Sequence, residues 1–271
     1  MNTKKFVILV TGATSGFGQA IADFLAGKGH IVYGTSRKIQ NISKKINFLQ
    51  MDITDVESIR KGIQTLIERE GKIDILINNA GVGVAGVLEL STVEEINFQI
   101  NTNLIGTMNV CSQILPYMRQ QRFGKVINIS SIAGVMGIPY QGLYSVSKFG
   151  IEAYSESLSL EIHPYNIKVI LVEPGDFHTG FTSNRKVSEL SLSNEDYKNS
   201  FVKTMKIIEK EELSGLKPIV LARKINRIIY KKRPKFRYSV ASPIQKIAIF
   251  AKKILPARWF QAILRMYYKI P

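Results

Sequence analysis

Three side chains that could perform acid–base chemistry stand together in the stretch SIAGVMGIPYQGLYSVSK, namely Ser131, Tyr144 and Lys148. Tyr144 and Lys148 are four residues apart in a segment with helical periodicity, so we expect them one turn apart on one helix face. The nearby ammonium favours the phenolate, which predicts a Tyr144 pKa below the ordinary value of about 10. Such a phenol can protonate an alkoxide or deprotonate an alcohol, and Ser131 can donate a further hydrogen bond to the same oxygen. Taken alone, the Tyr–Lys spacing is also typical of a solvated helix face.

A glycine-rich turn near the N-terminus indicates a site for phosphate. The β-branched run KKFVILV leads into TGATSGFG and then into a helical pattern, which predicts strand, turn and helix. Gly12, Gly16 and Gly18 allow a tight turn and a close approach of the backbone to phosphate at the helix N-terminus. The next predicted strand ends at Ser36-Arg37-Lys38 without an acidic residue, which favours NADP(H) over NAD(H) because an arginine accommodates a 2′-phosphate. The alternative is that Arg37 is only a surface charge.

Strand and helix patterns alternate through the first two thirds of the chain. Further strands are predicted to end near Asp52, Asn78, Ser131 and Pro174. This alternation predicts a single α/β domain, a doubly wound, Rossmann-type parallel sheet with helices on both faces. Ser131 then lies at the carboxyl edge of the sheet, where ligands bind in such folds. Residues 91–121 are predicted to form one or two long helices, with Pro116 marking a kink or a break.

The net charge of +16 is concentrated in the last third of the chain. Residues 1–180 hold 16 Lys and Arg against 15 Asp and Glu, whereas residues 181–271 hold 21 against 6. Residues 243–271 carry no acidic residue and are predicted to form a basic amphipathic extension of two short helices divided by Pro256. This tail could pack on the core, lie on a membrane surface or bind nucleic acid, and it contains no nucleic-acid recognition motif.

The cysteine count and the length of the apolar runs indicate the compartment in which the protein works. Cys111 is the only cysteine, so no internal disulfide can form, and a reducing, cytoplasmic compartment is expected. No apolar run is long enough to span a bilayer, so any contact with a membrane is expected to be made by the tail. We expect an NADP-binding catalytic domain over 1–242, with a substrate lid at about 181–213, followed by the tail at 243–271.

Five motifs occur in the order seen in short-chain dehydrogenases/reductases, and residues 4–180 resemble that family. The motifs are TGATSGFG, NNAG, Asn103 within NTNLIG, Ser131 with Tyr144-x-x-x-Lys148, and PGDFHT. Ser131 precedes Tyr144 by 13 residues and follows Asn103 by 28, spacings similar to those of the family. The stretch from NTNLIG to PGDFHTGF is most similar to the branch that holds 17β-hydroxysteroid and retinol dehydrogenases.

The resemblance implies roles for four catalytic residues. Tyr144 is the proton donor or acceptor, and Lys148 lowers its pKa and binds the nicotinamide ribose. Ser131 orients and polarises the substrate carbonyl, so Ser131 and Tyr144 also form the substrate-binding pair. Asn103 anchors a water that links Lys148 to solvent.

The resemblance also implies the residues that hold the cofactor. The glycine loop is expected at the pyrophosphate, Asp52 and Ile53 at the adenine, residues 79–81 at the adenosine side, and Thr179 at the carboxamide. The expected cofactor contacts, Arg37 included, are Gly12, Thr14, Ser15, Gly16, Phe17, Gly18, Arg37, Asp52, Ile53, Asn79, Ala80, Gly81, Tyr144, Lys148, Pro174, Gly175 and Thr179. No metal site is expected.

These features favour an NADP(H)-dependent oxidoreductase that interconverts a carbonyl and an alcohol on an apolar, lipid-, steroid- or retinoid-like substrate. A non-catalytic NADP-binding sensor or scaffold is the alternative from another class, although it would not need the complete catalytic set. A sugar-nucleotide epimerase or dehydratase is disfavoured by the glycine spacing and the modest length. The expected partners are the small apolar substrate and a second copy of the chain, without nucleic acid.

Overall fold

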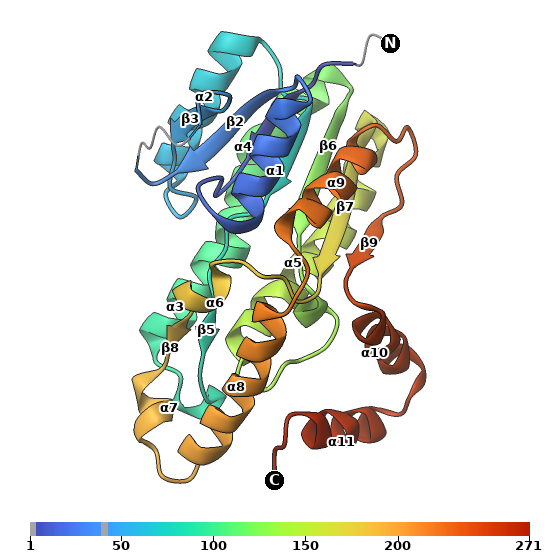
Figure 1. The fold of residues 1–271 in the computed structure, drawn as a ribbon. Coiled ribbons are helices and arrows are strands. Elements are labelled where there is room, and N and C mark those ends of the chain that lie inside the picture. The colour runs from blue at the N-terminus through green and yellow to red at the C-terminus, as the bar shows by residue number, and fades with distance from the viewer. Residues whose placement is uncertain (1–3, 39–42) are drawn as a thin grey trace.

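A seven-stranded parallel sheet forms the centre of the computed structural model, which describes residues 4–38 and 43–271 (Figure 1). Its strand order is β3-β2-β1-β4-β6-β7-β9, and every neighbouring pair is parallel. The strands are β1 (Val7–Val10), β2 (Ile31–Ser36), β3 (Asn47–Gln50), β4 (Ile75–Asn78), β6 (Gly124–Ile129), β7 (Ile167–Pro174) and β9 (Arg237–Val240). The strand order reverses between β1 and β4, so the predicted doubly wound sheet is confirmed.

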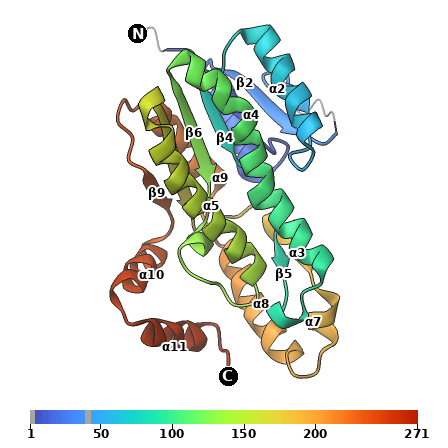
Figure 2. The same cartoon turned by 180° about the vertical axis from the view of Figure 1, so that it is seen from behind.

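Helices cover both faces of this sheet (Figures 1 and 2). One face packs against α1 (Gly16–Gly27) and α9 (Pro218–Ile229). The other face packs against α2 (Val56–Glu70), α4 (Gly106–Gln121) and α5 (Gly142–Glu161). Strand β1 shows how the sequence builds this arrangement, since Ile8 and Val10 point into the first layer and Val7 and Leu9 into the second. A strand buried on both faces therefore reads as one continuous apolar run.

The long helical region before β6 has a local irregularity. It consists of α3 (Val93–Ile100), a π-helical turn η2 (Asn101–Ile105) and α4. A break at Pro116 does not occur, because α4 continues through this residue to Gln121. The irregularity lies instead at residues 101–105, where a π turn inserts one extra residue into the helix, as such turns often do at functional sites.

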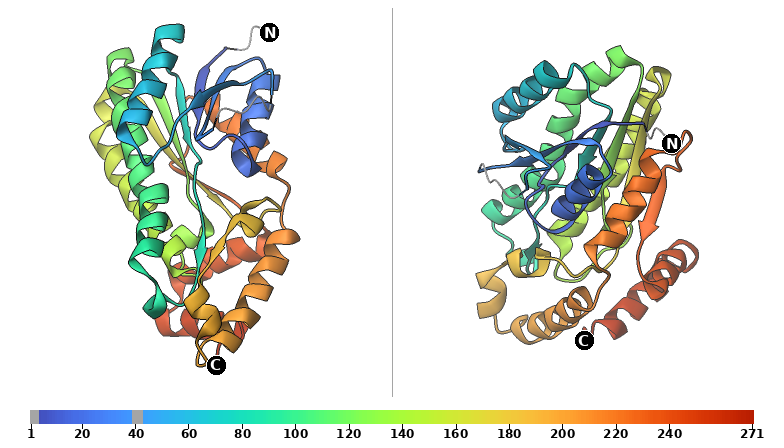
Figure 3. Two further views of the ribbon diagram at one scale, coloured as in Figure 1. Left: turned by 90° about the vertical axis from the view of Figure 1, so that its left-hand side faces the viewer. Right: turned by 45° about the horizontal axis from the view of Figure 1, so that its top comes forward.

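A second layer of short elements lies below the carboxyl ends of the strands (Figures 1 and 3). Strand β5 (Val84–Ala85) pairs with β8 (Lys186–Val187) in a small parallel sheet. This anchors the segment expected to be the lid. The remaining helices are η1 (Leu88–Leu90), η3 (Ile132–Gly134), η4 (His163–Tyr165), α6 (Phe181–Asn184), α7 (Glu189–Ser193), α8 (Lys198–Leu213), α10 (Pro243–Ile254) and α11 (Ala257–Tyr267).

The tail forms the two short helices that the sequence predicts on either side of Pro256. A capping box between Ser242 and Gln245 begins α10. Ile249 of α10 and Phe260 of α11 are buried with Phe201 of α8 in a third apolar cluster, separate from the two sheet layers. Within residues 4–38 and 43–271, no helix combines the length and the apolar character needed to cross a bilayer.

Candidate active site

The glycine loop between β1 and α1 has a shape that only glycine can form. Gly12 and Gly16 have φ angles of +64° and +54°, which L side chains rarely adopt. A Cβ on Gly18 would stand 2.1 Å from the carbonyl oxygen of Gly12, so that position also excludes any larger residue. Asn79 fixes the loop, because its Nδ2 donates to the carbonyls of Thr11 and Gly12 at 3.0 and 3.1 Å.

This loop fits the pyrophosphate of a dinucleotide. Ser15 occupies the N-cap of α1, and its side chain makes no capping hydrogen bond. The positive end of α1, whose first backbone N–H groups have no partner within the helix, is therefore available to an anion. Thr179 lies next to this loop, because a Cβ on Gly16 would be 3.7 Å from the Cβ of Thr179. When bound there, a nicotinamide dinucleotide supplies or accepts a hydride.

The other expected cofactor residues fall into two groups. Pro174 and Gly175 lie at the end of β7, and Gly81 lies beside Asn103, all at the carboxyl edge of the sheet. Arg37 is exposed at the end of β2. The second group consists of Phe17, Asp52 and Ile53, whose side chains pack inside the fold or form local hydrogen bonds.

Each of these three side chains already contacts another part of the protein. Ile53 is 7% exposed and packs on Gly106 of α4. Phe17 packs edge-on against Phe177, with ring centroids 4.8 Å apart. Asp52 accepts hydrogen bonds from the N–H and hydroxyl of Thr54. Their expected cofactor contacts stay predictions.

Strand β6 and helix α5 bring the three candidate catalytic side chains together. Ser131 follows the end of β6, and its Oγ accepts a hydrogen bond from the N–H of Ala133 at 3.1 Å. Lys148 is buried and donates from Nζ to the carbonyl of Ile129 at 2.8 Å. Its Nζ stands 5.6 Å from the centroid of the Tyr144 ring. The predicted proximity of Ser131, Tyr144 and Lys148 is therefore present, and their catalytic roles remain proposals.

Asn103 fixes the start of α5 through Ser147. Its Oδ1 accepts from the N–H of Val82 at 2.8 Å, and its Nδ2 donates to Val82 O at 2.9 Å and Ser147 Oγ at 3.1 Å. Ser147 in turn donates to the carbonyl of Tyr144 at 2.7 Å. Sequence reasoning missed Ser147, although its position three residues after Tyr144 places it on the same side of the helix. The expected water anchored by Asn103 stays a prediction.

Burial, and not the neighbouring ammonium, dominates the titration of this site. Burial raises the pKa of Tyr144 to about 12, an effect partly offset by the Ser131 side chain. Burial also lowers the pKa of Lys148 to about 8, against the opposing charge of Glu152. The expectation of a Tyr144 pKa lowered by Lys148 is wrong for this structure, because the ammonium is directed at Ile129 O. A phenol with a raised pKa stays protonated at neutral pH and can serve as a proton donor.

The segment that follows Thr179 packs against Tyr144. The Phe181 ring lies 5.4 Å from the Tyr144 ring. Behind it, Arg185 forms a buried ion pair with Glu212, which also accepts a hydrogen bond from the Thr182 hydroxyl at 2.7 Å. These contacts join residues far apart in the chain, and no local sequence pattern predicts them.

Asp176, in the loop after β7, connects the site to the tail. Its carboxylate accepts a hydrogen bond from Gln245 of α10. Burial, reinforced by the charges of Glu211 and Glu212, raises the pKa of Asp176 to about 7. The loop beside the expected nicotinamide site thus holds a carboxyl group that is partly protonated at neutral pH.

The sheet order, the glycine loop and the Ser131, Tyr144 and Lys148 cluster define an oxidoreductase that uses a nicotinamide dinucleotide. Residues 6–189 match the short chain dehydrogenase family. The chain belongs to this family, which acts on CH–OH groups and the corresponding carbonyls.

Similar proteins cover almost the whole chain. A protein of Bacteroides thetaiotaomicron named 3-ketodihydrosphingosine reductase is 52% identical over 264 residues, 97% of this chain and 98% of that one. The NADPH-dependent 3-dehydrocapnine reductase of Ornithobacterium rhinotracheale is 31% identical, over 96% of this chain and 95% of that one. The crystal structure of a short-chain dehydrogenase from Streptomyces avermitilis superposes with a TM-score of 0.82 at 28% identity, covering 99% and 98% of the two chains.

Substituting Tyr144→Phe tests the proton donor. The change keeps the ring and removes the hydroxyl, so turnover should fall by about 10² to 10⁴-fold with cofactor affinity largely unchanged. Steady-state turnover and a fluorescence titration with NADPH would measure both effects. Tyr154→Phe, the same change ten residues further along α5, is the matched control and should retain activity. Turnover near wild type in Tyr144→Phe would remove this phenol from the mechanism.

The raised pKa of Asp176 predicts a pH-dependent stability. Between its ordinary pKa of 3.8 and its folded value of about 7, the folded chain binds more protons at this group than the unfolded chain. This group therefore lowers the free energy of unfolding as the pH rises from about 4 to about 7. Asp176→Asn removes the effect. The melting temperature of the variant minus that of the wild type should therefore be larger at pH 7 than at pH 4. Asp23→Asn on α1 is the control, and an equal offset at both pH values in Asp176→Asn would contradict the assignment.

Proposed function

We propose that the protein reduces the 3-keto group of a long-chain amino ketone, 3-ketodihydrosphingosine, to the secondary alcohol with NADPH. The observation that carries this proposal is the 52% identity, over nearly the full length of both chains, to a protein with that named activity. The similarity to an NADPH-dependent reductase of another 3-keto compound supports the same reaction type. The resemblance to the 17β-hydroxysteroid and retinol dehydrogenase branch agrees with an apolar ketone as substrate.

The proposed reaction assigns each step to a side chain. The Ser131 and Tyr144 hydroxyls hold the carbonyl oxygen, and negative charge develops on this oxygen as the hydride arrives at carbon. Tyr144 then gives its proton to that oxygen. Reduction requires the protonated phenol, which is the form of Tyr144 at neutral pH. Lys148 holds the ribose side of the cofactor, and Asn103 positions α5.

An apolar groove beside the site supports a substrate with a long hydrocarbon chain. It has a volume of about 570 Å³ and lies between α11 and the loop that leads into α5. Gly142, which is two residues before Tyr144, is one of the residues that line this groove. The lining residues are Leu88, Gly137, Ile138, Pro139, Gly142, Arg258, Gln261, Leu264 and Arg265. Because most of them are apolar, burial of methylene groups there would favour longer substrates.

We assign the catalytic domain to residues 1–242 and the basic tail to 243–271. The boundary falls at the capping box of Ser242, where α10 begins. The lid is assigned to about 181–213, which matches α6 to α8. The single buried cysteine agrees with a reducing compartment, so the cytoplasm is the proposed place of action. A homodimer is the proposed assembly.

A chain-length series tests the substrate. Purified protein with NADPH would be given 2-amino-3-keto alcohols of increasing length, ending with 3-ketodihydrosphingosine, and the alcohol identified by mass spectrometry. Each methylene buried is worth about 0.8 kcal/mol, so kcat/KM should rise roughly fourfold per added CH₂ until the groove is filled. Simple 3-ketones of matched length are the control for the amino group. The proposal would be contradicted if the long-chain amino ketone were not turned over, or if kcat/KM did not depend on the chain length of the substrate.

Arg37→Asp tests the choice of NADPH over NADH. Arg37 is expected to pair with the 2′-phosphate through charge-assisted hydrogen bonds, each worth about 1.5–3 kcal/mol. The variant should therefore bind NADPH about 10 to 100-fold more weakly and bind NADH as well as wild type or better. Lys28→Asp, which reverses an exposed charge at the far end of α1, is the control. Tighter binding of NADH than of NADPH by the wild-type protein would overturn the assignment.

A further inference from the structure

We propose that α10 and α11 form a docking face for an anionic lipid bilayer. This goes beyond the proposed reaction and can be tested without substrate. The docking face consists of the exposed large apolar side chains of the two helices, namely Ile244, Ile247, Phe250, Ile254, Trp259, Ile263, Met266 and Tyr267.

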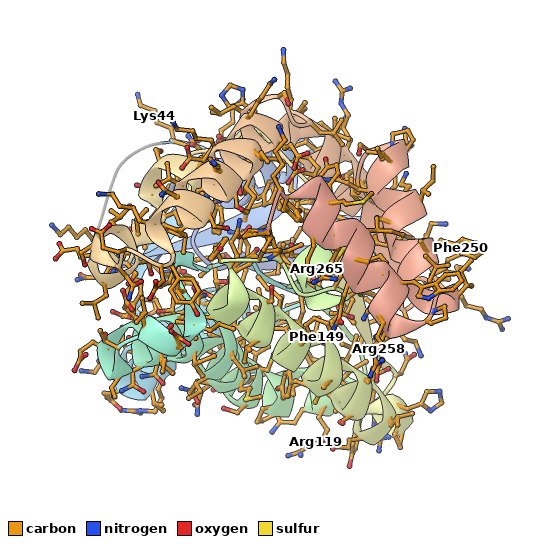
Figure 4. All side chains as sticks on the ribbon, turned by 90° about the horizontal axis from the view of Figure 1, so that it is seen from below. Lys44, Arg119, Phe149, Phe250, Arg258 and Arg265 are labelled. Atoms are coloured by element: carbon orange, nitrogen blue, oxygen red, sulfur yellow. The ribbon has the colours of Figure 1, made fainter. Side chains whose placement is uncertain are left out.

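The exposed apolar side chains form one stripe on each helix. Their exposed fractions run from 47% for Tyr267 to 79% for Met266. On α10, Ile247, Phe250 and Ile254 are three and four residues apart, which places them on one side of the helix. On α11, residues 259, 263 and 266 repeat the same spacing. Figure 4 shows Phe250 directed away from the body of the protein.

The opposite sides of the same helices already pack on the protein. Ile249, Phe260 and Tyr268 are each 9% exposed or less, and they join the apolar cluster of the lid helix α8. The carbonyl of Tyr268 accepts a hydrogen bond from the buried Thr204 hydroxyl at 3.0 Å. The tail is therefore held in place by one face, together with a hydrogen bond from the Tyr267 hydroxyl to Glu211 of α8. The other large apolar side chains of the docking face are exposed. Contiguous exposed patches of this kind mark interaction sites.

Charge decides which partner fits. The chain has fifteen Lys and Arg after Glu212 and no acidic residue. The tail's own basic residues are all exposed: Lys246, Lys252, Lys253, Arg258, Arg265 and Lys269. A second copy would bring the same six basic residues of the tail against these ones, and repulsion would oppose that contact. An anionic bilayer offers both negative headgroups for the basic residues and hydrocarbon for the stripe.

The helix dimensions and aromatic residues fit a position in the plane of the bilayer surface. Neither helix can cross a bilayer, since α10 has 12 residues and α11 has 11. Trp259 and Tyr267 are amphipathic rings of the kind found at headgroup level. The two helices would therefore lie at the interface with their stripes among the acyl chains.

Docking would also bring the substrate groove to the lipid. Arg258, Leu264 and Arg265 of α11 line this groove, and Figure 4 shows both arginines on the side of α11 that faces α5. A long-chain ketone could then pass from the bilayer along α11 toward Tyr144. This route, unlike docking itself, rests on the proposed function.

Vesicle binding of the full-length protein tests the docking face. Protein would be sedimented with vesicles of phosphatidylglycerol and phosphatidylcholine in equal amounts, and with vesicles of phosphatidylcholine alone. Binding is expected to the anionic vesicles, weakly to the neutral ones, and to decrease at high salt. The double substitution Ile247→Glu, Ile263→Glu should lower the partition coefficient by at least about tenfold, because each change puts a charge into the apolar stripe. Leu160→Glu, at a residue of α5 that is 78% exposed, is the matched control and should bind as wild type does.

The single tryptophan of the chain gives a second readout that needs no variant. Trp259 is 68% exposed, so its emission should shift to shorter wavelength on addition of anionic vesicles and become protected from a water-soluble quencher. Wild-type protein that stays in the supernatant with no change in emission would overturn the proposal. So would a double variant that binds as well as wild type. A wild-type dimer that the double variant dissociates, without vesicle binding by either, would identify the face as a contact between two copies and equally overturn it.

Discussion

The hydrogen bond from the buried Lys148 ammonium to the carbonyl of Ile129 is the contact on which the site depends. It joins the second turn of α5 to the last residue of β6, and these are the elements that carry Tyr144 and Ser131. A buried ammonium without such a partner would be strongly destabilising, so the pairing fixes the distance between helix and strand. Asn103 and Ser147 secure the same helix from the other side. The phenol therefore stands over the sheet edge because two separate tethers hold its helix.

Burial of Tyr144 and Lys148 also determines their pKa values. Removing Tyr144 and Lys148 from water disfavours both the phenolate and the ammonium, which raises the first pKa and lowers the second. The phenol therefore stays protonated at neutral pH. Residues after Thr179 contribute to this environment, since the Phe181 ring packs against the Tyr144 ring and the buried Arg185–Glu212 ion pair holds the same segment.

Local patterns predicted most of the fold and the composition of the site. The apolar run of β1, the glycine loop and the four-residue step from Tyr144 to Lys148 each depend on neighbours in sequence, and each was found as predicted. Contacts between distant segments could not be predicted. No sequence pattern indicated the π turn at residues 101–105. Of the kink or break predicted at Pro116, the break does not occur, because α4 continues through this residue. The amphipathic pattern of α11 predicted an apolar side but could not show that Phe260 is buried while Trp259 is exposed.

Titration of the Tyr144 phenol tests the central claim, that burial rather than the Lys148 charge governs the pKa of this group. Protein labelled with ¹³C at the tyrosine ring carbon that bears the hydroxyl would be titrated by NMR without added cofactor, with the Tyr144→Phe spectrum providing the assignment. The structure predicts a Tyr144 pKa about two units above the ordinary value, at about 12. A Tyr144 resonance that titrates at or below about 10 would contradict the account, because it would show that the ammonium outweighs the cost of burying the phenolate.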